Sequence, residues 1–331
     1  MLAARTAEMD AFQPTLKLAF AEHNAGRHAE AETLCRSLMP AHPHDAQLLF
    51  LLGMILHKTG REAEAVTHLR AAAKLQPDSA RIFSGLGYAC QNLGELSEAV
   101  KCFSRASELE PQNANHFYSL GNVLHRLGEL ESAAAAFEKA VAAAPLDAEC
   151  WNNLGKTFRQ LNRLEESIAA YARAVEIAPD YKMARQGWSH SLLAAGRLAE
   201  GFRQYQSRER VFSEPLWNGD AIPGKTLFIY AEQGFGDAIH FARFLPFVRA
   251  KAGRVILECR PELKSLFAAA GCAEEIIAFG EPIPPFDFYT SVMRLPGALG
   301  ITLENIPHNV PYLKAPADMI LPGAESRQDR R

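Results

Sequence analysis

The sequence lacks the features that mark membrane-spanning, disulfide-stabilised and zinc-binding proteins. Its longest apolar run, at 48–56, is too short to cross a bilayer, and the N-terminal residues show no apolar signal-peptide core. Six cysteines occur without a C-x-x-C spacing, and eleven histidines occur without a paired ligand spacing. We therefore expect a cytoplasmic protein with reduced cysteines, no metal site and no membrane partner.

An excess of charge of one sign is also lacking. The formal net charge is −3 over 331 residues, which provides no strong field to attract nucleic acid or anionic lipid. We expect no nucleic-acid partner. The hydrophobic fraction of 48% and the length are instead sufficient for two folded domains.

A period of 34 residues is the strongest pattern that is present. Proline cannot continue a helix, and glycine permits the left-handed turn that ends one. Each period is therefore expected to hold two antiparallel helices. The markers are Pro43, Pro77, Pro111, Pro145 and Pro179, in phase with Gly26, Gly60, Gly94, Gly128 and Gly196, while Asn162 replaces one glycine.

Small and aromatic residues recur in the same register, as in Trp151, Leu154 and Gly155 followed by Ser167 and Tyr171. Small side chains are needed where two helices cross closely. At these positions the sequence resembles tetratricopeptide repeats (TPR), weakly over 12–45, strongly over 46–181 and as a divergent capping unit over 182–213. The resemblance implies an α-solenoid of about six TPR helical hairpins over 12–213, after an N-terminal extension at 1–11.

The first helices of stacked TPR hairpins line a concave groove. Positions 5, 9, 12 and 13 of each unit share one helical face. This face could capture a protein or an extended peptide, which we favour, or could be a solvated face that only keeps the array soluble. The candidate contacts are Tyr88, Asn122, Arg126, Asn152, Asn153, Lys156 and Arg159, and the same face holds Phe50, Met54, His57, Lys58, Ser84, Gln91, Asn92, Tyr118, His125 and Gln160.

After residue 213 the pattern changes to alternating strands and helices. Strands are expected at 226–230, 254–259, 274–279 and 286–292, with helices at 237–251 and 261–271. This alternation predicts a doubly wound parallel sheet in a domain over 214–316, which binds ligands beyond the carboxyl ends of its strands. The polar residues 317–331 are expected to form a disordered tail.

The stretch AEQGFGDAIHF, 231–241, follows the first predicted strand. Its ligand-loop candidates are Glu232, Gln233, Gly234 and Gly236, because glycines let the backbone turn sharply and approach a ligand closely. Ile239 occupies the third glycine position of a dinucleotide fingerprint, which excludes that motif. Asp237 is expected at or near the N-cap of the next helix.

The segments GKTLFIYAEQGFGDAIHFARFLPFV, FDFYTSVMRLPGALG and IPHNVPYL resemble the first half of the GT-B glycosyltransferase-like domain of many bacterial TPR proteins. That domain is similar to O-GlcNAc transferases and lipopolysaccharide heptosyltransferases. The resemblance implies a partial Rossmann-like (GT-B N-terminal half) domain, in which Asp237 is a general base toward an acceptor hydroxyl; an N-cap role alone is the alternative. We expect no cofactor, and a nucleotide-sugar donor only if the missing second half is supplied.

Two functions are therefore open. The first is a TPR protein- or peptide-binding scaffold that carries an incomplete glycosyltransferase-like domain and is not catalytic alone. The second is a glycosyltransferase that transfers a sugar from a nucleotide-sugar to a protein or glycan acceptor, with this chain as the acceptor-side half. The sequence favours the first.

Overall fold

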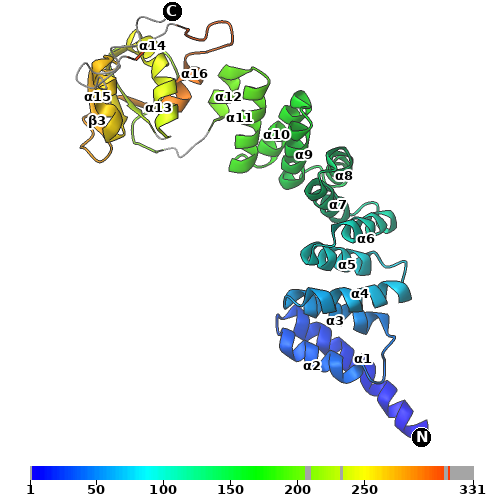
Figure 1. Cartoon of the computed structure of the whole chain (residues 1–331). Helices are drawn as coiled ribbons and strands as arrows, with labels where there is room; N and C mark the ends of the chain where they lie inside the picture. Colours follow the sequence, from blue (N-terminus) through cyan, green and yellow to red (C-terminus); the bar gives the residue numbers. More distant parts are fainter. Residues whose placement is uncertain (1, 206–209, 232–233, 309–311, 314–331) are drawn as a thin grey trace, which may run out of the picture. The chain divides into compact units, whose positions relative to one another are not determined.

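The chain forms two compact units in the computed structural model, which describes residues 2–205, 210–231, 234–308 and 312–313. Unit 1 comprises residues 1–161, and unit 2 comprises residues 162–331. Unit 2 holds the last helices of the array together with the sheet (Figure 1). The domain boundary at 213/214 stays a prediction, and the predicted tail at 317–331 lies outside the described residues.

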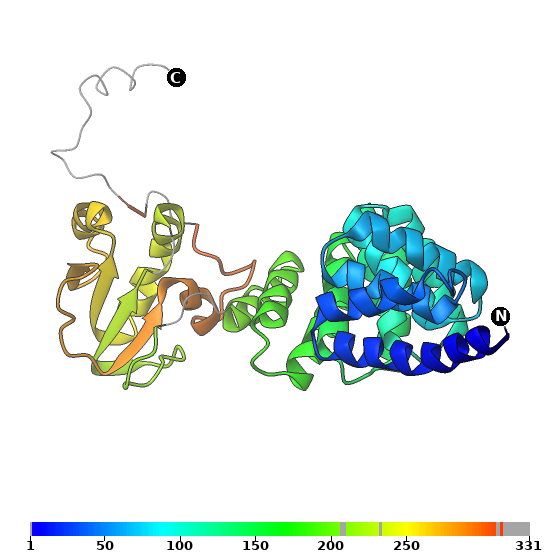
Figure 2. The same ribbon diagram turned by 90° about the horizontal axis from the view of Figure 1, so that it is seen from below.

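Unit 1 is a succession of antiparallel helices, each packed on the next (Figures 1 and 2). The first helix starts at Leu2, so the predicted extension at 1–11 is continuous with it. The pairs α3/α4, α5/α6 and α7/α8 confirm the helical hairpins expected from the 34-residue period. The helices are α1 (Leu2–Asn24), α2 (His28–Leu38), α3 (Ala46–Lys58), α4 (Glu62–Leu75), α5 (Ala80–Leu93), α6 (Leu96–Leu109), α7 (Ala114–Leu127), α8 (Leu130–Ala143) and α9 (Ala148–Gln160).

The turns between paired helices use the left-handed backbone that the glycines predict. Gly94 and Gly128 end α5 and α7 with φ of 89° and 81°. Asn162, at φ 57°, is the one non-glycine residue with positive φ in the part of the chain that the structure describes. Asparagine tolerates this conformation better than other side chains, so its replacement of glycine in the periodic pattern is explained.

Small residues are required where the paired helices cross. A Cβ atom on Gly87 would lie 2.9 Å from the Phe103 ring, and one on Gly121 would lie 2.7 Å from the Phe137 ring. Both rings are buried. In these two units, the early glycine therefore allows an aromatic side chain of the second helix to pack against the first helix.

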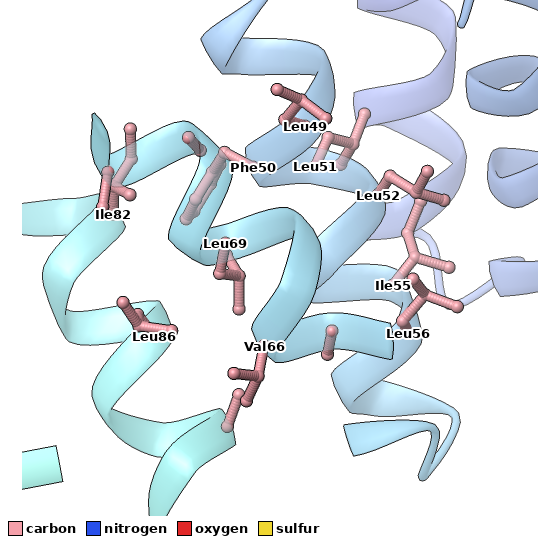
Figure 3. Close-up of a cluster of buried hydrophobic side chains, with 14 of the residues drawn as sticks. Leu49, Phe50, Leu51, Leu52, Ile55, Leu56, Val66, Leu69, Ile82 and Leu86 are labelled. Atoms are coloured by element: carbon pink, nitrogen blue, oxygen red, sulfur yellow. The ribbon is translucent and has the colours of Figure 1, made fainter. Parts of the chain in front are cut away.

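The apolar core of unit 1 is densest around α3. This helix is apolar on almost its whole circumference because α1, α2, α4 and α5 all contact it. Side chains from α3, α4 and α5 converge in this core (Figure 3). Phe50 belongs to the same cluster and is 6% exposed, so the core extends to the face formed by the first helices.

Unit 2 contains a four-stranded parallel sheet in the order β3-β2-β1-β4. The four strands confirm the four strands predicted from the sequence. Within the same unit, helix α12 packs against helix α16. The elements are α10 (Leu164–Ile177), α11 (Lys182–Ala194), α12 (Leu198–Gln204), β1 (Ile222–Tyr230), α13 (Phe235–Phe241), η1 (Ala242–Phe244), α14 (Leu245–Arg249), β2 (Ala252–Cys259), α15 (Pro261–Ala269), β3 (Glu275–Ala278), β4 (Phe288–Ser291), η2 (Val292–Arg294) and α16 (Leu295–Ala298).

The sheet differs from the predicted doubly wound arrangement. Leu227 and Ile229 share a cluster with side chains of α13, α14 and α15, whereas Phe228 and Tyr230 pack against Phe212 and residues 283–289. The connection from β3 to β4 contains three prolines, at 282, 284 and 285, which prevent a crossover helix. In the described part of unit 2, helices therefore cover one face of the sheet only, and the Rossmann-like prediction is not supported.

The predicted helix at 237–251 is also interrupted. It consists of α13, the 3₁₀ turn η1 and α14, with Pro246 near the start of α14. Proline removes one backbone donor and clashes with the preceding turn, which accounts for the interruption at this position.

Candidate functional site

The first helices of the hairpins in unit 1 share one face, because α3 contacts both α1 and α5. A cavity of about 390 Å³ opens on this face. Four of the sequence-predicted groove residues line it: Phe50, Met54, Ser84 and Tyr88. The complete lining is His23, Asn24, Phe50, Leu51, Met54, Arg81, Ser84, Gly85, Tyr88, Glu110, Asn113 and His116.

Phe50, Met54 and Gly85 form the apolar part of the cavity. A Cβ atom on Gly85 would lie 2.8 Å from Met54 Sδ and 3.2 Å from Phe50 Cε2. The absence of a side chain at Gly85 therefore lets the two apolar side chains of α3 approach α5. The result is an apolar surface that remains partly accessible from the groove.

Arg81 stands at the edge of this apolar surface. Its guanidinium lies over the ring of Phe50 at 4.6 Å and over that of Phe20 at 5.6 Å. Arg81 and Phe50 also line a neighbouring cavity of about 280 Å³, with Phe20, Gln47, Gln76, Ser79 and Ile82. A ligand that crosses Arg81 would therefore reach two adjacent depressions, with a cation between them.

Glu110, Asn113 and His116 bring hydrogen-bonding groups to the cavity. His116 Nε2 lies 2.9 Å from Glu110 Oε2, and Asn113 Nδ2 donates to the same oxygen at 3.0 Å. These bonds hold the pKa of Glu110 below its usual range. The only carboxylate among the described lining residues is thus already bonded within the protein.

The charged groups around His23 are positive. Burial lowers its pKa below the ordinary value, and the charges of His28, Lys58 and Arg81 lower it further. Its Nδ1 atom is buried without a hydrogen-bond partner among the described residues. At neutral pH this side chain is therefore an uncharged polar group beside cations.

Several predicted contacts further along the groove bond to each other across repeats. Tyr118 Oη donates to Glu149 Oε1 at 2.5 Å and accepts from Asn153 Nδ2 at 3.0 Å. Burial and the Glu149 carboxylate raise the pKa of Tyr118 to about 12, although a hydrogen bond from Asn122 opposes the shift. In this part of the groove, Asn122 and Asn153 are therefore engaged within the array.

The remaining predicted contacts differ in accessibility. Asn152 is buried, at 5% exposed, whereas Arg126 and Lys156 are exposed and Arg159 is half-buried. His125 and Gln160 are hydrogen bonded to each other. The cations are thus the predicted side chains that stay most available to a ligand here.

The loop after β1 lies at the carboxyl edge of the sheet in unit 2. Glu232 and Gln233 lie outside the described residues. The N-cap of α13 is Gly234, and Asp237 is the third residue of the helix. Asp237 therefore lies in the first turn of the helix, near the N-cap but not at it.

The two glycines of this loop lie in open surroundings. A Cβ atom on Gly234 or Gly236 would meet no described atom within 4 Å, and neither residue has positive φ. Close contacts with the described residues therefore do not require glycine at either position. Their use in approaching a ligand stays a prediction.

Two buried hydroxyl groups lie on β4, next to the end of β1. Ser291 pairs with Tyr230 in register, and the side-chain oxygens of Thr290 and Ser291 have no hydrogen-bond partner among the described residues. The strand order reverses between β1 and β4, which is where open parallel sheets bind ligands. Among the described residues there is no cluster of three metal-ligating side chains and no helix long and apolar enough to span a membrane.

Family models of the tetratricopeptide repeat match residues 13–37, 85–148 and 126–182, and a TPR repeat model matches 53–94. The helical array consists of tetratricopeptide repeats. In TPR numbering, Phe50 and Ser84 occupy position 5, and Met54 and Tyr88 occupy position 9. These four residues of the predicted TPR face line the cavity, and the use of that face in binding stays a prediction.

Known proteins with similar segments include Protein FlbA of Caulobacter vibrioides, 42% identical over 17% of this chain and 11% of FlbA. Among solved structures, YrrB, described as a TPR protein with an unusual peptide-binding site, is 20% identical, with 58% of this chain and 98% of YrrB covered and a TM-score of 0.49. TTC0263, a TPR protein of Thermus thermophilus, is 26% identical, with 55% and 98% covered and a TM-score of 0.40. The assignment of the tetratricopeptide repeats rests on the family models and not on these similarities.

Sequence reasoning missed the TPR positions that complete the cavity. Arg81 is at position 2 and Gly85 at position 6, one turn or less from the predicted Ser84. His23 belongs to the weakly matching first repeat, and Glu110 to the end of a second helix. A wider stripe at i, i+3 and i+4 spacing would have included Arg81.

Proposed function

We propose that the TPR array of unit 1 is a protein- or peptide-binding scaffold and that the cavity on α1, α3, α5 and α7 is its binding site. The open cavity of about 390 Å³ carries this proposal. It combines an apolar surface from Phe50 and Met54 with a few converging polar groups, which is the usual composition of a recognition site. It also lies on the face that solenoids use for binding.

The alternative, a face that only keeps the array soluble, fits these observations less well. Tyr88 is 38% exposed on this face. Phe50, Leu51 and Met54 also line the cavity. A purely solubilising face would carry charged side chains at such positions instead.

The test is to select binding peptides from a random library on the full chain and to measure their affinity for two matched variants. Ser84→Phe places a ring in the cavity, whereas Ser97→Phe places the same ring on the exposed surface of α6 in the same repeat. We expect Ser84→Phe to weaken binding roughly tenfold or more, about 1.4 kcal/mol, and Ser97→Phe to have no effect. Equal affinity for both variants, with unchanged circular dichroism, would show that the peptides bind elsewhere.

A second function, glycosyl transfer, is favoured by one observation in unit 2. Asp237 lies just beyond β1, next to the strand that bears the unpartnered hydroxyl of Ser291. In this proposal Asp237 accepts the proton of an acceptor hydroxyl in the partial GT-B-like domain, and the donor-binding half is supplied separately.

This second function is tested by nucleoside-diphosphate release from a panel of nucleotide-sugars in the presence of the full chain, a separately added GT-B donor-binding half and a glycan acceptor. Release that Asp237→Asn abolishes and Asp180→Asn preserves would support it, since Asp180 is an exposed carboxylate of the same unit. Equal release by both variants would contradict the role of Asp237.

A further inference from the structure

The arginines of unit 1 whose side chains the structure describes fall into two groups that correlate with their place in the hairpins. Those on second helices, or directly before them, all form ion pairs with glutamate. These pairs are Arg27–Glu22, Arg36–Glu32, Arg61–Glu64, Arg70–Glu98 and Arg105–Glu108. Arg81, Arg126 and Arg159, on the first helices α5, α7 and α9, form no ion pair with any described residue.

The local sequence explains this separation. Arg61 and Arg105 have a glutamate three residues further on, the spacing that favours ion pairs on a helix. By contrast, the helices α3, α5 and α7 contain no acidic residue at all. The single glutamate of α9, Glu149, accepts the hydroxyl of Tyr118. The face of the first helices therefore carries unpaired cations.

Three carboxylates near this face, Glu62, Glu110 and Glu149, offset its charge only in part, because they are fewer than its cations. Glu110 is bonded by Asn113 and His116, and Glu62 accepts from His57 and Asn92. Lys58 and Lys156 add to the charge of the three arginines and take part in no ion pair within the part of unit 1 that the structure describes. Positive groups therefore outnumber negative ones along the groove.

Two of the unpaired arginines are also placed in a way that suits a ligand carboxylate. Arg81 is held over the Phe50 ring, at the border of the two cavities. Arg159 Nε is buried and has no hydrogen-bond partner among the described residues. Guanidinium groups bind carboxylates with two parallel hydrogen bonds.

We propose that the ligand of the TPR groove is an extended acidic segment of a protein. Its carboxylates meet Arg81, Arg126 and Arg159, and an apolar side chain enters the cavity over Phe50 and Met54. Because alternate side chains of an extended segment point in opposite directions, residues two apart can reach the cation and the cavity on the same side. This inference rests on the proposed function and adds the chemistry of the partner.

The experiment measures fluorescence anisotropy of labelled peptides with the full chain. The probe is a peptide of repeated Asp-Ser-Phe-Ser, in which Asp and Phe stand two residues apart and so lie on the same side, compared with matched peptides that carry Asn or Lys instead of Asp. We expect the Asp peptide to bind roughly tenfold more tightly than the Asn peptide, and the Lys peptide to bind most weakly. Added salt should weaken binding of the Asp peptide and leave that of the Asn peptide almost unchanged.

Arginine variants test whether the affinity for the Asp peptide depends on the first helices. Arg81→Gln, Arg126→Gln and Arg159→Gln are each expected to weaken binding of the Asp peptide by roughly threefold to tenfold. Arg105→Gln is the matched control, because it removes an arginine of α6 that is paired with Glu108. We expect it to leave the affinity unchanged.

Three results would overturn the acidic partner. One is equal binding of the Asp and Asn peptides by the wild-type chain, which would leave the peptide-binding function intact. The second is an equal loss of affinity in Arg105→Gln. The third is tighter binding of a single-stranded oligonucleotide than of the Asp peptide, which would assign the cations to phosphate. Failure of the proposed function itself gives a different result: the selected peptides would bind Ser84→Phe and the wild-type chain with equal affinity.

Discussion

Tyr118→Phe tests whether a residue that looks like a ligand contact in the sequence is a structural one. The substitution removes only the hydroxyl, which donates to Glu149 at 2.5 Å and accepts from Asn153 at 3.0 Å. Tyr118 is on α7, whereas both partners are on α9. The hydroxyl therefore links two successive repeats, and we expect its loss to destabilise unit 1 without weakening peptide binding in the cavity.

The magnitude follows from the surroundings of the two bonds. A typical hydrogen bond contributes about 0.5–1.5 kcal/mol, and one to a charged group more. Because Glu149 is exposed and solvent screens its charge, we assign the ordinary value to each bond. Tyr118→Phe should therefore lower the free energy of unfolding by about 1–3 kcal/mol.

The assay is urea unfolding of the full chain, followed by circular dichroism, for Tyr118→Phe, Glu149→Gln and the double variant. If the hydroxyl and the carboxylate act together, the double variant should lose less stability than the sum of the single ones. The same variants are then titrated with a peptide selected on the wild-type chain. Unchanged stability of Tyr118→Phe, or a large loss of peptide affinity, would refute the structural role.

Two further predictions concern charge and burial. Because the pKa of His23 is lowered in the folded chain, the unfolded state takes up a proton first as the pH falls. The stability of unit 1 should therefore fall as the pH is lowered through the ordinary histidine value of 6.5. A His23→Gln variant should show a shallower fall in its urea midpoint, and an identical fall would contradict the assignment. Burial raises the pKa of Glu258 in spite of its ion pair with Arg210. Glu258→Gln should therefore leave the free energy of unfolding of unit 2 at neutral pH unchanged or higher, whereas Arg210→Met, which leaves the carboxylate unpaired, should lower it by about 1–3 kcal/mol. The reverse order of the two variants in thermal unfolding would be inconsistent with this explanation.

The helices of unit 1 could be predicted from the sequence because their limits have local causes. Proline stops a helix, and glycine or Asn162 adopts the left-handed turn that ends one. The close crossing of paired helices is local as well, since Gly121 and Phe137 belong to one repeat. These features depend on short segments of chain and are therefore visible in the periodic pattern.

The cavity could be predicted only in part, because its remaining residues are brought together by stacking. Arg81 faces Phe50 of the preceding repeat, and Tyr118 meets Glu149 of the following one. No spacing within one repeat reveals such pairs. In the same way, the sequence pattern did not show which polar residues of the groove are already bonded to each other.

The sheet of unit 2 could likewise be predicted from the sequence only in part. Apolar runs predicted all four strands, since burial of a strand leaves a direct pattern in the sequence. The prolines at 282, 284 and 285 indicate in the sequence itself that no crossover helix connects β3 to β4. The start of α13 was not readable in this way, because Gly234 begins the helix without a capping side chain.

The most direct test of the central claim, that the ligand lies on the first helices of the TPR array, is photo-crosslinking of a selected peptide. The peptide carries a benzophenone group at its apolar position, and the labelled residues of the full chain are identified by mass spectrometry. We predict labels on α3 and α5, at Phe50, Met54 or Tyr88. Labels confined to the second helices α4 and α6, or to unit 2, would contradict the claim.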